Sequence, residues 1–246
     1  MTDIKFFDYL EKSTCILCGG DLSEMEQPQT TVCDYCGKMG TVSHICENGH
    51  YICDSCLKVP VMDFIQRVCT EYSSNNPIEL AIKIMNSPIV RMHGPEHHYL
   101  TPAVLLTVYS NLTNKFSNLE QTLQDLKIYI QNEAPQQCSY NAGTCGAAIG
   151  SKVFFLHYLN DVFSPEDLEE YGEYVKNETI HQIDEFHLPR CCKRDTYTSL
   201  LVVSNFLNEK LDLNIEVSEP KCIFSLRNKT CGLSDCPYFN IGNFVG

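Results

Sequence analysis

The sequence is poor in basic residues: 18 Lys and Arg stand against 31 Asp and Glu, and the formal charge is −13. A chain this acidic is repelled by phosphate backbones and by anionic membrane surfaces. One short basic cluster stands out, formed by Arg190, Lys193 and Arg194. We therefore expect no nucleic-acid partner, and we interpret the acidity as a source of solubility.

Long apolar runs are also missing. No segment approaches the ~18 uninterrupted apolar residues of a membrane span. Asp3 and Asp8 fall where a secretory signal would be apolar. Low-complexity tracts are absent, as are internal repeats other than C-x-x-C units. These absences predict a cytoplasmic protein that makes no membrane contact.

Cysteine, in contrast, is abundant, with 15 residues in a chain of 246. The count is odd, so the thiols cannot all pair within one chain. Several stand in C-x-x-C pairs, which suit a tetrahedral metal ion better than long-range crosslinks. We therefore expect reduced thiols and a metal-binding protein rather than a disulfide scaffold.

The first sixty residues carry four successive ligand pairs. A spacing of two residues lets both sulfurs of one turn face the same ion. Eight ligands fit two closed zinc sites, whose expected roles are folding and docking. Pairs one and three can share an ion, as can pairs two and four; alternatively, each half of the segment forms its own site. The predicted ligands are Cys15 and Cys18, Cys33 and Cys36, Cys46 and His50, and Cys53 and Cys56.

Beyond about residue 60 the pattern becomes helical, with apolar residues at helical spacing from Val61 to Val68. The fold expected is mainly α: a zinc-binding module over residues 1–58, then a helical domain over residues 59–246. That domain should contain about six helices and end in an irregular, cysteine-rich tail. Residues 1–12 could add a short helix.

Helix starts can be read from local signals. Asn76 before Pro77 and Ser164 before Pro165 combine an N-cap with a proline in the first turn. Ser117 with Glu120 forms a capping box. A further helix should begin at about Thr101.

Three polar loops interrupt the helical domain, and each precedes a helix. The first, His93–His98, offers Glu96 and His97 as metal ligands or as acid and base; the bland alternative is a helix-capping loop. The second, Gly143–Gly150, places Cys145 among small residues that allow a cofactor or substrate to come close. We expect the three loops to converge on one cavity.

The third loop, Pro189–Asp195, holds the adjacent residues Cys191 and Cys192 between Arg190 and Arg194. Nearby cations and a helix start should lower their thiol pKa values. Adjacent side chains point apart, so one thiol, preferably Cys191, should face the site. The alternative is a buried Cys192 beside a solvated basic face.

The tail adds Cys222, Cys231 and Cys236 as candidate cofactor ligands. The final Cys-Pro dipeptide also closes some ferredoxin cluster motifs, although the spacing differs here. Cys69 and Cys138 have no such context, and we expect them to be packing residues.

Taken together, several of these strings resemble those of a known family. The strings Cys53-Asp-Ser-Cys56, Met92-His-Gly-Pro-Glu-His-His98, Gly146-Ala-Ala-Ile-Gly150, Arg190-Cys-Cys-Lys-Arg194 and Cys231…Cys236-Pro-Tyr238 resemble archaeal and bacterial proteins catalogued as a domain of unknown function. The resemblance spans nearly the whole chain. It implies a domain found alone or joined to methyltransferase-type domains, and it implies no established activity.

The loop order is also similar to the helical catalytic domain of iron–sulfur L-serine dehydratases and cysteine desulfidases. That resemblance implies a 4Fe-4S cluster on three cysteines, with an open iron that binds substrate. The matching elements here are Thr144-Cys145-Gly146 and Pro189-Arg190-Cys191. The expected cysteine before the second element is absent from Thr179–Leu188, so the third ligand would be Cys192 or a tail cysteine. His93–His98 also replaces the serine-rich substrate loop.

Three functions follow from these observations. The first is a metal- or iron–sulfur-dependent enzyme for elimination or desulfuration of a small thiol or hydroxyl compound. There Glu96 or His97 would abstract a proton and Arg190 or Arg194 would bind a carboxylate. The second is a non-catalytic zinc module that carries sulfur or a cluster to a methyltransferase-type partner. The third is a purely structural zinc protein.

Overall fold

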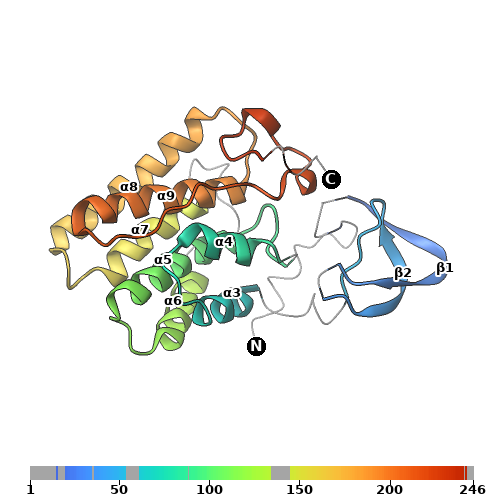
Figure 1. Ribbon diagram of the computed structural model, residues 1–246, viewed down its shortest axis with the longest axis horizontal. Coiled ribbons are helices and arrows are strands. Elements are labelled where there is room, and N and C mark those ends of the chain that lie inside the picture. The colour runs from blue at the N-terminus through green and yellow to red at the C-terminus, as the bar shows by residue number, and fades with distance from the viewer. Residues whose placement is uncertain are drawn as a thin grey trace.

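The computed structural model describes residues 15, 20–34, 36–53, 61–87, 89–133, 145–240 and 242. Within these residues a two-stranded hairpin comes first, and seven α-helices follow it (Figure 1). The expected mainly helical fold with a Cys/His-rich N-terminal group is therefore confirmed. The short helix expected over residues 1–12 lies outside the described residues.

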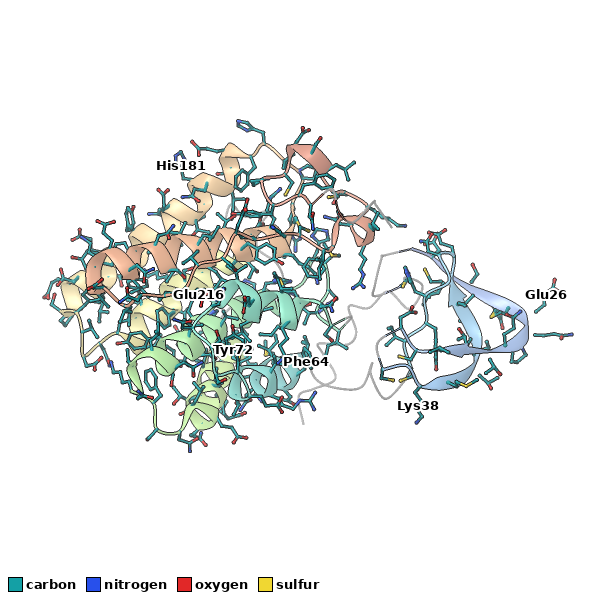
Figure 2. The ribbon with its side chains drawn as sticks, in the orientation of Figure 1. Glu26, Lys38, Phe64, Tyr72, His181 and Glu216 are labelled. Carbon is teal, nitrogen blue, oxygen red and sulfur yellow. The ribbon has the colours of Figure 1, made fainter. Side chains whose placement is uncertain are left out.

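The hairpin consists of β1, Leu22–Val32, and β2, Met39–Cys46, paired antiparallel from Leu22↔Cys46 to Val32↔Met39. Most of its side chains are exposed, and Figure 2 shows Glu26 at its outer tip, away from the helices. The buried residues beneath it form a small cluster of their own: Cys15, Cys33, Cys46, Ile52 and Cys53. Four of these five are cysteines, so the hairpin has almost no apolar core to hold it.

The helices pack around a separate and much larger core. Helix α5 lies at its centre: it is buried on every side from His97 to Ser110 and contacts five of the other helices. The elements are α3 Val61–Thr70, α4 Pro77–Met85, α5 His97–Thr113, α6 Leu119–Glu133, α7 Gly146–Tyr158, α8 Pro165–Glu185 and α9 Cys192–Leu211, followed by the 3-10 turns η2 Ser225–Arg227 and η3 Leu233–Asp235.

Three helix starts were predicted from capping signals, and two of them have the predicted cap. Asn76 Oδ1 accepts hydrogen bonds from the backbone N–H groups of Ile78 and Glu79 at the start of α4. Ser164 Oγ accepts one from Asp167 N–H, 3.1 Å away, at the start of α8. At α6 the cap differs from the expected box, because Asn118 Oδ1 accepts the bond from Gln121 N–H at 3.1 Å.

Helix α5 begins at His97, four residues earlier than expected, so that Pro102 lies inside the helix. Helix α7 passes close to this proline at Gly150, where an added Cβ would lie 2.6 Å from Pro102 Cδ. The earlier start brings His97 and His98 into the buried first turn.

Within the described ranges, no helix combines the length and apolar character needed to cross a bilayer.

Candidate functional site

The N-terminal ligands gather into two groups of three. Cys15, Cys46 and His50 form one group and Cys33, Cys36 and Cys53 the other, with all ligand atoms of a group within 4.8 Å of one another. The Cys36 and Cys53 sulfurs are 3.7 Å apart, and Cys15 Sγ is 3.8 Å from His50 Nδ1. Sulfurs around a tetrahedral ion with ~2.3 Å bonds stand about 3.8 Å apart. Each group can therefore hold a metal ion.

The grouping joins alternate pairs of the sequence. Cys15 of the first pair meets the third pair, and Cys33 and Cys36 of the second pair meet Cys53 of the fourth. This is the interleaved one of the two arrangements that the sequence left open. The remaining expected ligands, Cys18 and Cys56, lie outside the described residues.

Tight turns place these ligands. Gly37 and Gly49 adopt positive φ angles of 72° and 80°, which a glycine tolerates best. Backbone N–H groups also point at sulfur: Asn48 N–H donates to Cys46 Sγ at 3.4 Å and Cys53 N–H to Cys33 Sγ at 3.3 Å. Such bonds orient and stabilise thiolate ligands.

A second group of cysteines lines a pocket between the start of α9 and the tail. The tail folds back on itself, since Cys222 N–H donates to Tyr238 C=O at 2.8 Å. The cavity measures about 20 Å³, and its lining includes Arg194 and Asn228. The cysteines that line it are Cys191, Cys222, Cys231 and Cys236.

The two other candidate cofactor cysteines lie elsewhere. Cys192 is buried and its sulfur lies 3.2 Å from Arg190 Nη2, which donates to it. Cys145 is buried with Ala147, Ala148 and Ile183, and its Sγ lies 3.8 Å from Asp195 Oδ2. Neither contributes to the described lining of the pocket.

The lowered pKa expected for the Cys191 thiol is wrong, while a functional role of Cys191 stays a prediction. Burial raises the pKa of Cys191 to about 12, and Arg194 only partly offsets that effect. Sequence reasoning counted the flanking cations but could not see the depth at which the thiol lies. A metal ion would be needed to hold this sulfur as a thiolate.

The alternative interpretation, a solvated basic face at the start of α9, does not hold for Lys193 and Arg194. Lys193 is buried, donates to the carbonyls of Met85 and Val90, and lies 4.1 Å from the centre of the Phe224 ring. Burial lowers the pKa of Lys193 to about 7. Arg194 pairs with Asp195 at 3.0 Å and is only 4% exposed.

The histidine loop is also tied to its surroundings. Arg91 donates to both carboxylate oxygens of Glu96. Burial alone would raise the pKa of Glu96, but the Arg91 charge, the nearby His97 and the hydrogen bonds to the carboxylate together hold that pKa below its usual value. His97 Nδ1 lies 2.9 Å from Thr196 Oγ1, and its Nε2 lies 3.2 Å from Arg91 C=O. These contacts favour structural roles for Glu96 and His97.

His98 differs from its neighbour. Its Nδ1 lies 2.9 Å from Pro95 C=O, while its buried Nε2 has no hydrogen-bond partner among the described residues. The ring lies against Gly146, where an added Cβ would be 2.6 Å away. Together with the contacts of Cys145 with Asp195 and of His97 with Thr196, this shows that parts of all three polar loops meet around the first turn of α9.

Several residues of this region carried no signal that the sequence argument used. Asp195, Thr196, Asn228 and Tyr238 join the loops or line the pocket, yet each is a common residue outside any ligand spacing. The cysteines of the described ranges are all thiols rather than disulfides, as expected. Cys69 is fully buried, and burial raises its pKa to about 12, in keeping with a packing role.

Comparison with known proteins identifies the family. A model described as a family of unknown function (DUF5714) matches residues 65–239, and the chain belongs to that family. No curated protein and no solved structure gives a match. The links to methyltransferase-type domains and to the iron–sulfur dehydratases therefore remain expectations from the sequence resemblance.

Proposed function

We propose that this member of the DUF5714 family is a zinc-stabilised, non-catalytic carrier module. Two zinc ions fold the N-terminal hairpin, which docks a partner enzyme, and cysteines of the helical part carry a metal cluster or sulfur for that partner. The observation that carries the proposal is the meeting of alternate Cys/His pairs in two compact groups.

Zinc is the metal that best suits these donors. Thiolate and imidazole ligands at tetrahedral spacing are typical of structural zinc. By sequence spacing, Cys18 completes one site, of three cysteines and a histidine, with Cys15, Cys46 and His50. Cys56 completes the other, a site of four cysteines, in the same way. The hairpin buries few apolar side chains, so metal binding would supply most of its folding free energy.

Docking is the role left for a closed site, because four protein ligands leave no position for substrate or water. The contacts of the two acid–base candidates also favour a non-catalytic role. Glu96 is held by Arg91, and His97 is engaged at both ring nitrogens. A methyltransferase-type enzyme is the partner that the sequence resemblance suggests.

The runner-up is an iron–sulfur enzyme of the elimination or desulfuration type. Two observations favour it: the unpartnered Nε2 of His98 beside Gly146, and the Arg194 side chain in the lining of the cysteine pocket. Anaerobically reconstituted protein would then release pyruvate from L-serine, or sulfide from L-cysteine. The carrier proposal expects neither product, and expects instead that the bound cluster or sulfur passes to an apo-ferredoxin acceptor.

Zinc removal tests the hairpin part of the proposal. A strong chelator should abolish the protection of residues 20–53 in hydrogen exchange, while α3–α9 keep theirs and the helical circular dichroism changes little. Cys33→Ser should lower the zinc content from about two ions to about one. Cys69→Ser is the control: it alters a buried packing thiol and should keep both ions. A hairpin that stays protected without metal would contradict the proposal.

A further inference from the structure

We propose that Cys191, Cys222, Cys231 and Cys236 form a third metal centre, built for an iron–sulfur cluster with four thiolate ligands. This inference rests on the proposed function in one respect: it names the cargo site of the helical part. The zinc sites of the hairpin are independent of it.

Four cysteines from two separate parts of the chain converge on one pocket. Cys191 stands at the start of α9, and the other three cysteines belong to a tail that follows the helix by more than ten residues. The tail folds back on itself: Cys222 N–H donates a hydrogen bond to Tyr238 C=O, and the backbones of Cys222 and Phe239 form an isolated parallel β-bridge. All four side chains then line one pocket. The pocket therefore brings the three tail cysteines together with the cysteine at the start of α9.

Backbone N–H groups donate hydrogen bonds to the sulfurs of these cysteines. Phe224 N–H donates to Cys222 Sγ and Leu233 N–H to Cys231 Sγ, each at 3.4 Å and each from two residues ahead. Asn48 N–H makes the same bond to Cys46 Sγ in the hairpin site, also at 3.4 Å. Hydrogen bonds to sulfur are a main means by which proteins stabilise clusters.

One of these turns is strained. Leu233 has a φ of 49°, in the left-handed region that residues with a Cβ avoid. The same turn directs Leu233 N–H at Cys231 Sγ. Strain kept beside a candidate ligand suggests that the bond to sulfur is worth retaining.

The distances between the pocket sulfurs suit a cluster better than a single metal ion. Across the described residues, the hairpin groups are the ones in which three ligand atoms lie within 4.8 Å of one another. No three of the pocket cysteines meet that limit, although a single zinc ion requires sulfurs about 3.8 Å apart. A four-iron cluster holds each thiolate on a different iron, so its ligands stand wider apart. The Arg194 side chain in the lining would offset part of the negative charge of such a cluster.

Four cysteine ligands also limit the reactions that a cluster in this pocket can catalyse. A cluster with a cysteine on every iron has no open iron to act as a Lewis acid. The centre therefore differs from the three-cysteine site that the dehydratase resemblance implies. It fits a cluster that the protein carries for a partner better than one that binds substrate.

The test uses the full chain, purified anaerobically and reconstituted with ferrous iron and sulfide. We expect about four iron and four sulfide per chain with an absorption band near ~400 nm, in addition to about two zinc. Cys222→Ser and Cys236→Ser should each lower the iron content at least twofold and leave the zinc content unchanged. Cys192→Ser, which alters the neighbouring thiol outside the pocket, should keep iron, sulfide and zinc. Circular dichroism confirms that each variant is folded.

Three results would overturn the inference: no bound iron, zinc alone bound in the pocket, or iron that survives in Cys222→Ser and Cys236→Ser but is lost in Cys192→Ser or Cys145→Ser. Loss of the expected zinc with iron retained would instead count against the hairpin proposal and support the cluster. The two ideas can therefore fail separately.

Discussion

At the scale of single residues, burial decides the behaviour of the ionisable groups around α9. His97 illustrates the effect: it is 2% exposed, and burial lowers its pKa to about 4. Nε2 lies 3.2 Å from the carbonyl oxygen of Arg91, and Nδ1 lies 2.9 Å from Thr196 Oγ1, whose hydroxyl donates to the carbonyl of Cys192. The imidazole is therefore a neutral link between the histidine loop and α9.

This link predicts a pH dependence of stability. Between pH 6.5 and 4 the unfolded chain binds a proton at His97 while the native protein does not. The stability present above pH 6.5 is therefore lost as the pH falls toward 4. From pH 7.5 to 5 the part of this loss that is due to His97 should be about 2 kcal/mol in the free energy of unfolding, measured by urea titration as the difference between wild type and a variant without this histidine.

The His97→Gln variant should remove that part of the pH dependence, whatever its effect at neutral pH. His181→Gln is the matched control, because His181 is exposed on α8 beside Glu185. Equal pH slopes for wild type and His97→Gln would contradict the assignment.

At the scale of elements, the close approach of α5 and α7 depends on a glycine. A Cβ on Gly150 would lie 2.6 Å from Pro102 Cδ and 3.1 Å from His98 C=O. A proline ring and a backbone carbonyl in a packed helix have little freedom to move. Gly172 in α8 offers a contrast, since its Cβ would meet the flexible Lys152 chain at 3.3 Å.

We therefore expect Gly150→Ala to lower the free energy of unfolding by about 1–3 kcal/mol. Gly172→Ala should leave it unchanged or raise it by up to ~1 kcal/mol, because alanine favours the helix. Urea midpoints of the two variants provide the comparison. A Gly150→Ala variant as stable as Gly172→Ala would show that the helices can move apart without cost.

The elements also show what the sequence could predict. Local signals gave the starts of α4 and α8, because an N-cap such as Asn76 acts within its own turn. The hairpin was missed because β1 is largely polar and exposed, with no alternating apolar face. The start of α5 was misplaced because Pro102 sits inside the helix, where the approach of α7 rather than local propensity decides the packing.

At the scale of the whole molecule, the sequence predicts candidate metal ligands, whereas the fold decides which of them come together. Spacing alone predicted eight N-terminal ligands, and the folded hairpin brings six of them together in two groups drawn from alternate pairs. In the helical part, the sequence marked Cys191 and the tail cysteines as candidates. It could not separate them from Cys145 and Cys192, because residue depth and the return of the tail are tertiary properties.

The zinc count of two double variants tests the interleaved sites most directly. Cys15→Ser with Cys46→Ser removes two ligands from one site, so native mass spectrometry after dialysis against a chelator should find about one zinc per chain. Cys15→Ser with Cys33→Ser damages both sites and should leave about none. The reverse pattern, with zinc retained in the second variant and lost from the first, would mean that each half of the segment forms its own site and would contradict the account.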